Sequence, residues 1–511
     1  MRGGFYLLWL CVCLILFCAA ASAEEGPTTN TPAGPPKAKS EPVEETLHGH
    51  KILDPYRYLE DSSNPDTQGY VRAQLTYTRE LLDPLPGRNQ IHQRLEQLLT
   101  IGNVGTPEIG GKYYFYTRRE GMQNQPVLYV REGVNGKDRV LVDANQLAAD
   151  GTISLDWWHP THDGKYVAYG TSPSGSEMST LRVIESATGR LLPDTIERTR
   201  AASIAWKLDD SGFYYTRLPK KGDVAEGQEM YNRHVFYHAM GTDAARDPLI
   251  FGEGRDPEDW PNVSLSNDGR WLLITVEQGW TKSELFLMDV NAGTPPVRIT
   301  TGKNFLYGGD VYNGNVYIVT NEDASRYRVF RASAERPARE AWQEIIPQSD
   351  AVLQATTIIH GQLFGLYEKN ATSLIKRFNE NGSFLSDLQL PGLGSVAGVG
   401  GNWDSNEMFF GFQSFTVPPS IYHVEFNDAG TNAKAATKKN QQASLKPATL
   451  WAKVDAPSIN PAAYEVNQVW YSSKDGTRVP MFVVHKKGLE KNGKNPTLLT
   501  GYGGFNVSMT P

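Results

Sequence analysis

Short apolar runs, many of them alternating with polar residues, recur along most of the chain and are divided by glycine or asparagine turns. PEIGGKYYFY, VSLSNDGRWLLI and VYNGNVYIV each place two strand-like runs around a short turn. Alternation around such a turn indicates a β-hairpin. Seven units of this pattern follow one another, with turns at Gly110-Gly111, Asp163-Gly164, Ser211-Gly212, Asp268-Gly269, Asn313-Gly314, His360-Gly361 and Ser405-Asn406.

The turns are about 45 to 57 residues apart, which is the length of a four-stranded propeller blade. We therefore predict a mainly β fold with a seven-bladed β-propeller over residues 102–428. An irregular array of β-sandwiches is the alternative, and the recurrence of the turn at the same place in each unit favours the propeller. Tryptophans within the units are predicted to pack between sheets; they are Trp157, Trp158, Trp206 and Trp271.

Two segments outside these units carry other patterns. Ser63-Asn64-Pro65 is typical of a helix start and predicts helices over residues 65–82 and 88–100. Later, YEVNQVWYSSKDGTRVPMFVVHKKG predicts two strands around Asp475-Gly476, followed by a third strand over residues 496–499. The later pattern indicates the first sheet of a further domain.

The first 23 residues are typical of a secretory signal. Arg2 precedes an apolar stretch, and Ala21-Ser22-Ala23 forms an A-x-A cleavage site. We expect a secreted or periplasmic protein with no stable membrane association after cleavage. An uncleaved membrane anchor is the alternative, because the apolar run approaches the length that spans a bilayer. The bulky Phe17 argues against a lipoprotein site at Cys18. All three cysteines lie in this segment, so the mature chain has none for a disulfide or a thiolate metal site.

Length and composition set the remaining domain boundaries. A chain of 511 residues is too long to fold around one hydrophobic core, so at least two domains are expected. We predict a disordered linker over residues 24–43, a surface excursion at 429–455, and the start of the further domain at 456–511. The net charge of −7 has no blocks of like charge, which argues against a nucleic-acid partner.

The sequence TLLTGYGGFNVSMTP places clustered glycines after an apolar run. A phosphate loop is disfavoured, because Asn506 stands where G-x-G-x-x-G needs its third glycine. A tight turn without chemistry is one remaining explanation. The other is a loop that supplies hydrogen-bond donors to an oxyanion, as after an early strand of an α/β-hydrolase.

Taken with other strings, this loop resembles the prolyl oligopeptidase family of serine peptidases. HGHKILDPYRYLED, GMQNQPVLYV, DGTISL, SPSGSE, FYHAMGTD, SNDGRWLLI and SSKDGTRVPMFVVHKKG occur in the family's order. The resemblance implies a seven-bladed propeller inserted into an α/β-hydrolase domain, with residues 44–101 as an N-terminal segment that packs with that domain. It implies cleavage of short peptides after proline, with the propeller as a size-selective cap. It also implies a monomer that needs no cofactor or metal. An oligopeptidase of other specificity is the alternative within the peptidases, and the GYGGF string favours the proline-specific branch.

The resemblance assigns roles to four residues. Tyr502 corresponds to the tyrosine whose hydroxyl helps form the oxyanion hole, and Phe505 to an aromatic wall of the proline pocket. Trp260 and Trp280 are candidates for subsites farther from the cut bond, and packing in the blade core is the alternative for both. A phenol hydroxyl suits the developing charge of a tetrahedral intermediate, and a flat ring stacks well on a pyrrolidine.

The chemistry of the family needs more than these residues. The chain contains no G-x-S-x-G, and its ten histidines all precede the GYGGF loop. We therefore expect a C-terminally truncated prolyl oligopeptidase that is inactive alone; a non-catalytic secreted propeller that binds a partner is the alternative. His48 and His50, or His159 and His162, lack acidic or cysteine partners at ligand spacing, so no metal site is predicted.

Overall fold

The structure, a computed structural model, describes residues 34–427, 443–456, 460–504 and 507–511. The chain consists of two compact units, Met1–Gln97 and Leu98–Pro511. The predicted signal peptide lies outside the described residues, as does Phe505.

The first unit contains a hairpin and helical segments. Strands β1 (Val43–Leu47) and β2 (His50–Asp54) pair antiparallel, and a short 3-10 turn, η1 (Arg57–Glu60), follows. The helices are α1 (Pro65–Leu82) and α2 (Arg88–Leu99), which confirms the two predicted helices. The Asn64 side chain caps α1 by accepting from the Asp66 backbone N–H, and Pro65 occupies the first turn. None of the helices in the described part of the chain is long and apolar enough to cross a bilayer.

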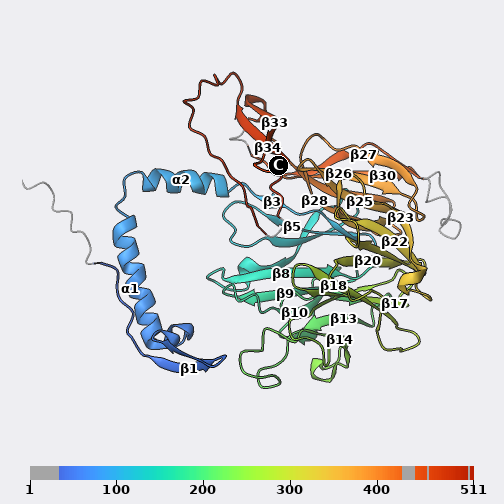
Figure 1. Ribbon diagram of the computed structural model, residues 1–511, viewed down its shortest axis with the longest axis horizontal. Helices are drawn as coiled ribbons and strands as arrows, with labels where there is room; N and C mark the ends of the chain where they lie inside the picture. The colour runs from blue at the N-terminus through green and yellow to red at the C-terminus, as the bar shows by residue number, and fades with distance from the viewer. Residues whose placement is uncertain (1–33, 428–442, 457–459, 505–506) are drawn as a thin grey trace, which may run out of the picture. The chain divides into compact units, whose positions relative to one another are not determined.

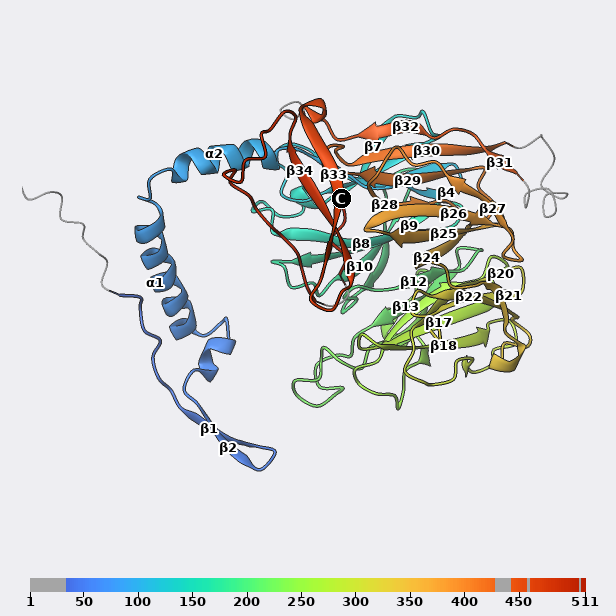
Figure 2. The same cartoon turned by 45° about the horizontal axis from the view of Figure 1, so that its top comes forward.

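Seven antiparallel sheets follow one another in the described part of the second unit. Each is built from strands that are consecutive in sequence, and Figures 1 and 2 show them succeeding one another from teal through green and yellow to orange. This arrangement is a seven-bladed β-propeller, so the predicted mainly β fold is confirmed.

The first four blades contain strands of two to eight residues. Blade 1 contains β3 (Asn103–Val104), β4 (Glu108–Gly110), β5 (Tyr113–Arg119), β6 (Val127–Glu132) and β7 (Asp138–Asp143). Blade 2 contains β8 (Ile153–Pro160), β9 (Tyr166–Pro173), β10 (Thr180–Glu185) and β11 (Leu191–Ile196). Blade 3 contains β12 (Ile204–Trp206), β13 (Gly212–Arg217), β14 (His234–Ala239) and β15 (Leu249–Phe251). Blade 4 contains β16 (Trp260–Leu265), β17 (Trp271–Gln278), β18 (Lys282–Asp289) and β19 (Val297–Arg298).

The last three blades continue the same order. Blade 5 contains β20 (Tyr307–Tyr312), β21 (Asn315–Thr320), β22 (Arg328–Ser333) and β23 (Gln343–Ile346). Blade 6 contains β24 (Val352–Ile359), β25 (Gln362–Lys369), β26 (Thr372–Phe378) and β27 (Phe384–Leu388). Blade 7 contains β28 (Ser395–Gly400), β29 (Glu407–Gln413), β30 (Ser420–Asn427), β31 (Ser444–Leu445) and β32 (Thr449–Lys453).

The predicted turns lie between β4 and β5 in blade 1 and between the first and second strands of each of the other blades. Gly164 and Gly314 adopt φ of +74° and +68°, a left-handed conformation that glycine enters without strain. Gly111 also has positive φ, and a Cβ atom there would lie 2.3 Å from the carbonyl oxygen of Asp163 in the next blade. Small turn residues therefore let neighbouring blades approach closely at this end of the propeller.

The hydrophobic core lies between neighbouring blades rather than in one centre. One cluster joins Leu273 and Leu285 of blade 4 to Val316 and Ile318 of blade 5. The middle strands are covered on both faces, as in β17, where four consecutive residues from Trp271 are buried. This burial explains why the middle strands read as nearly continuous apolar runs.

The described part of the expected surface excursion at 429–455 is not loop throughout, because residues 443–455 include the short strands β31 and β32. Within it, β32 pairs with β30, so part of the segment extends the last blade. Trp451 provides the physical reason, because its ring packs edge-on against Tyr116 with a centroid distance of 5.2 Å. The remaining boundaries of the predicted domains stay predictions.

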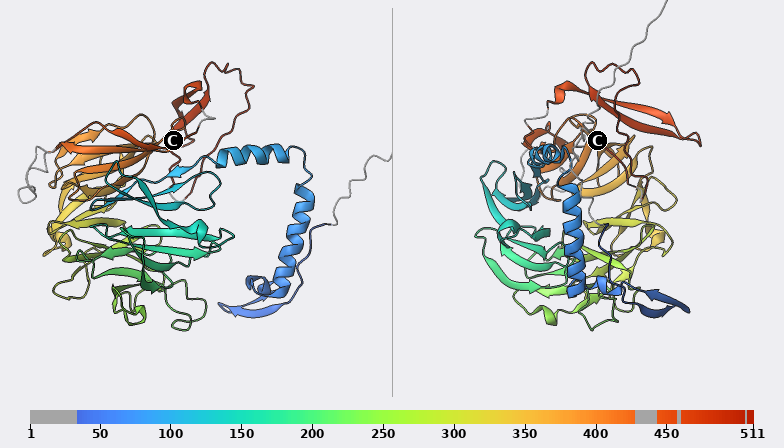
Figure 3. Two further views of the ribbon diagram at one scale, coloured as in Figure 1. Left: turned by 180° about the vertical axis from the view of Figure 1, so that it is seen from behind. Right: turned by 90° about the vertical axis from the view of Figure 1, so that its left-hand side faces the viewer.

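A separate hairpin consists of β33 (Tyr464–Ser472) and β34 (Arg478–Lys486), which pair along their full length around Asp475-Gly476, as predicted. Figure 3 shows it in red beside the orange strands of the last blades. The predicted third strand over residues 496–499 is wrong: these residues form no strand, and Leu498 is 91% exposed. A strand requires a hydrogen-bonded neighbour, and no described strand pairs there.

Candidate functional site

The C-terminal segment contacts one end of the propeller, which we call the loop end. It is the end opposite the glycine turns and carries the β25–β26 turn and the β29–β30 loop. Phe482 of the hairpin packs on Phe415 with ring centroids 5.4 Å apart, and the Gln468 amide donates to the Asn370 carbonyl at 2.5 Å. Farther along, the Ser508 hydroxyl donates to Glu368 at 2.7 Å. The residues on both sides of the GYGGF loop therefore meet the loop end.

A cavity of about 530 Å³ opens beside the β17–β18 turn. Its walls come from blades 4, 5 and 6, and they carry two carboxylates, Glu277 and Asp310, and no lysine, arginine or histidine. The full lining is Thr275, Glu277, Gly279, Trp280, Ser283, Leu306, Tyr307, Gly308, Gly309, Asp310, Val319, Tyr327, Gln354, Ala355 and Thr356. The cavity is thus acidic and partly aromatic.

Trp280 and Trp260 belong to the same blade and lie near its loop end. Trp280 is 76% exposed in the turn between β17 and β18 and lines the cavity. Trp260 begins β16 and stands opposite Glu277 in the strand register. The Arg233 guanidinium lies over the Trp260 ring at 4.0 Å. Two of the predicted subsite residues are therefore brought to one blade end.

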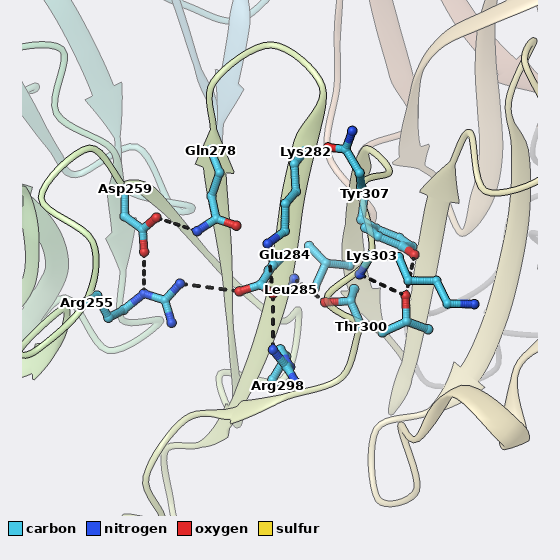
Figure 4. A network of polar contacts seen from close by, with 12 residues as sticks. Arg255, Asp259, Gln278, Lys282, Glu284, Leu285, Arg298, Thr300, Lys303 and Tyr307 are labelled. Carbon is cyan, nitrogen blue, oxygen red and sulfur yellow. Dashed lines mark hydrogen bonds and ion pairs between the residues drawn. The ribbon is translucent and has the colours of Figure 1, made fainter.

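A polar network anchors the hairpin that carries Trp280 (Figure 4). The Gln278 amide donates to Asp259 at 2.6 Å, and Arg255 Nε donates to the other oxygen of the same carboxylate at 2.6 Å. Arg255 also reaches the buried Glu284, which pairs with Arg298 at 3.3 Å. Side chains held by packing and by several charge-assisted bonds change position little, so the base of this turn is fixed while the indole stays exposed.

Asp310 stands at the junction of two cavities. It also lines a cavity of about 190 Å³ toward the glycine turns, together with Asn402 and Trp403. Burial raises the pKa of Asp310 to about 6, because desolvation disfavours the charged form. Glu108, beside a third cavity of about 280 Å³, has its pKa raised by burial to about 7.

Asp310 and Glu277 were missed by the sequence reasoning. The available signal was a polar residue inside the short strand YGGDVY, where a fully packed strand would be apolar.

Tyr502 lies in an open setting. It is 60% exposed and makes no hydrogen bond or ring contact with another described residue. The neighbouring Gly503 has φ of +79°, so the turn uses the conformational freedom of glycine. The described residues therefore do not join Tyr502 to Trp260 or Trp280 by direct contact. Phe505, the other predicted pocket residue, lies outside the described residues.

The histidines considered as metal ligands have other surroundings. His48 and His50 are exposed on the β1–β2 hairpin. His162 pairs with Asp404 at 3.0 Å and stacks on Trp403 at 4.2 Å, and burial lowers the pKa of His159 to about 4. The described ranges contain no group of three His, Cys, Asp or Glu side chains arranged to hold an ion.

Comparisons with known proteins agree with this architecture. The family model of the prolyl oligopeptidase N-terminal beta-propeller domain matches residues 35–437. The prolyl endopeptidases of Elizabethkingia meningoseptica and Elizabethkingia miricola are 32% and 31% identical over 480 residues. Each alignment covers 93% of this chain and 65% of the relative, so the chain spans just under two thirds of their length.

Solved structures of prolyl oligopeptidases are also similar to this chain. A structure from a study of two prolyl endopeptidases is 35% identical, with a TM-score of 0.81 over 93% of this chain and 68% of that one. Prolyl oligopeptidase B from Galerina marginata, at 22% identity, has a TM-score of 0.73 over 89% of this chain and 65% of that one, which supports the fold alone. The chain belongs to the prolyl oligopeptidase family.

Proposed function

We propose that the chain is the propeller-bearing part of a serine endopeptidase that cleaves short peptides after proline. One observation carries the proposal: the segment with Tyr502 meets the same end of the propeller that holds the cavity beside Trp280. A peptide in that cavity would lie between a propeller wall and the loop that supplies the oxyanion donor. The propeller would act as a cap that excludes large substrates.

Each predicted residue has a role in this reaction. The Tyr502 hydroxyl donates to the oxyanion of the tetrahedral intermediate, an interaction typically worth about 3 kcal/mol. The Phe505 ring packs on the substrate proline, and Trp260 and Trp280 contact residues farther from the cut bond. The nucleophile of such an enzyme is a serine in a G-x-S-x-G turn, with histidine as base and aspartate to orient it. The 511 residues contain no such turn, so we propose that they are inactive alone.

We further propose a secreted or periplasmic location and a monomeric state. The signal-like sequence of the first 23 residues supports the location.

Sequencing the encoding DNA through and beyond codon 511 is the decisive experiment. A reading frame that continues into a G-x-S-x-G turn, then Asp and His, is the expected result. The product of that frame should release 4-nitroaniline from an N-blocked Gly-Pro 4-nitroanilide, and the 511-residue chain should not. Turnover by the purified 511-residue chain above a blank would contradict the proposed inactivity.

The Tyr502→Phe variant of that longer product tests the oxyanion role. Because the hydroxyl acts mainly in the transition state, kcat should fall about 10²- to 10³-fold with KM little changed. A rise in KM with unchanged kcat would instead assign Tyr502 to ground-state binding.

A non-catalytic secreted propeller is the second candidate. Propellers host many binding functions, so the fold alone is compatible with it. A stop codon directly after codon 511 would support this candidate over the peptidase.

A further inference from the structure

The cavity beside Trp280 carries negative charge from two different blades. Glu277 lies on β17, and Asp310 lies on β20. The Asn262 amide donates to Glu277 at 3.3 Å, whereas the side-chain carboxyl of Asp310 makes no hydrogen bond or ion pair with another described residue. A carboxylate that is partly removed from water and lacks a protein partner is a strong point of attraction for a cation.

Aromatic rings complete the walls around these carboxylates. Trp280 presents an indole that is 76% exposed, and Tyr307 and Tyr327 also line the cavity. The face of an aromatic ring attracts an ammonium or guanidinium group, and a tryptophan ring does so more strongly than a tyrosine ring. Carboxylates combined with an exposed indole therefore favour an organic cation over a neutral or anionic group.

The space fits a side chain rather than a lone ion. A volume of about 530 Å³ lies within the range of small-ligand sites. Gly308 forms part of the wall, and a Cβ atom built on it meets no heavy atom within 4 Å. The absence of a side chain at this position keeps the cavity open.

A neighbouring cation, Arg233, is already held by other groups. Arg233 is 2% exposed, lies over Trp260, and donates to the Ala201 carbonyl at 2.7 Å and to the Thr216 hydroxyl. It does not line the cavity. It interacts electrostatically with Glu277, so Asp310 is the less compensated of the two acids.

We propose that this cavity binds the positively charged group of a peptide ligand, a lysine or arginine side chain or a free α-amino group, through Glu277, Asp310 and the Trp280 ring. The inference rests on the proposed function insofar as the ligand is taken to be a peptide. It adds a charge preference to that function: proline-containing peptides with a cation are preferred over neutral or acidic ones.

Calorimetric titration of the purified 511-residue chain tests this preference. The probes are acetylated tetrapeptide amides, Xaa-Ala-Ala-Pro, with Lys, Arg, Gln or Glu at Xaa, and the Gln peptide with a free amino terminus. We expect the Lys or Arg peptide to bind about tenfold more tightly than the acetylated Gln peptide, and the Glu peptide to bind most weakly. Tight binding of the free-amino Gln peptide would identify the amino terminus as the preferred cation.

Variants separate the cavity from general charge effects. Glu277→Gln with Asp310→Asn should reduce the Lys-to-Gln ratio to less than twofold, and Gly308→Leu should weaken all peptides by filling the space. Glu258→Gln removes an exposed acid of the segment before blade 4 that does not line the cavity, so it should leave the ratio unchanged. Thermal unfolding of each variant verifies that it folds.

The possible failures are distinguishable. Equal binding of all peptides would overturn the charge preference and leave peptide binding intact. A preference that survives the Glu277→Gln and Asp310→Asn changes would overturn the cavity assignment. If no peptide binds at millimolar concentration, the inference falls together with the proposal of a peptide ligand for this chain.

Discussion

At the scale of single residues, Arg233 shows how a buried guanidinium can be held by hydrogen bonds to neutral acceptors rather than by a direct ion pair. Burial lowers its pKa to about 9, and its described hydrogen-bond partners are the carbonyls of Arg200 and Ala201 and the hydroxyl of Thr216. Arg233→Met would leave the Arg200 and Ala201 carbonyls without this donor and would remove the guanidinium from the face of Trp260. We expect a loss of about 2 kcal/mol in the free energy of unfolding, measured by urea denaturation.

Arg217 provides the matched control for this prediction. Its guanidinium also lies over a ring, Phe236 at 4.3 Å, but the side chain is partly exposed and donates to the Ala244 carbonyl. Arg217→Met should cost less than about 1 kcal/mol, because water can replace the lost contacts. Equal losses for the two variants would mean that burial of Arg233 does not determine its contribution.

At the scale of elements, a buried histidine ties blade 2 to blade 3. His238 on β14 is fully buried. One ring nitrogen lies 3.0 Å from a carboxylate oxygen of Asp194 on β11, and the other lies 3.0 Å from a carboxylate oxygen of Asp247. Despite desolvation, hydrogen bonds to the two carboxylates raise the pKa of His238, and the bond to His238 helps to lower the pKa of Asp194. The charged histidine can donate from both ring nitrogens, whereas the neutral ring donates from one.

The raised pKa of His238 gives a pH dependence of stability with a definite sign. Its contribution is fully present below the unfolded value of about 6.5 and is lost as pH rises through the folded pKa. The contribution of Asp194 is present above about 3.9 and is lost at lower pH. Urea midpoints should therefore fall as pH rises above about 6.5, and His238→Asn should flatten this part of the profile.

Tyr215→Phe is the control for the histidine. It removes a hydroxyl that donates to Asp247 at 2.8 Å and leaves His238 in place. The variant should lower stability by a similar amount at every pH in this window. A profile flattened by Tyr215→Phe, or unchanged by His238→Asn, would show that another group causes the pH dependence.

Local patterns predicted the elements well, because turns and helix starts depend on neighbouring residues. Asn64-Pro65 and the glycine turns are signals of this kind, and they gave α1 and the hairpins of each blade. The cavity could not be predicted in this way. Glu277 and Asp310 lie on different blades and share a wall only because β20 follows blade 4 around the ring. The prediction of a third strand over residues 496–499 was wrong because an apolar run forms a strand only beside a hydrogen-bonded partner strand, which the local sequence does not reveal.

At the scale of the whole molecule, side chains close the ring between blade 1 and blade 7. Each of these sheets uses strands from its own part of the chain. Across the junction, the Trp451 indole donates to the Val134 carbonyl at 3.1 Å, and the Asn402 amide donates to the Ile109 carbonyl at 2.5 Å. Tyr114 also donates to Glu407. The junction is therefore joined by packing and side-chain bonds rather than by an exchanged strand.

Because side-chain contacts close the ring, we predict that a substitution at the junction increases local opening only in the two blades that meet there. Trp451→Ala removes a ring that packs on Tyr116 and Phe409, so we expect a loss of about 3 kcal/mol. Hydrogen exchange should accelerate in blades 1 and 7, because local opening needs only the contacts that hold those sheets together. Amides of β16 to β18 should keep their protection.

Trp342→Ala, at a buried position in blade 5, is the control and should instead accelerate exchange in blades 4 and 5. Uniform acceleration in all seven blades by Trp451→Ala would show that the propeller opens as one cooperative unit, and the junction would then have no separate role.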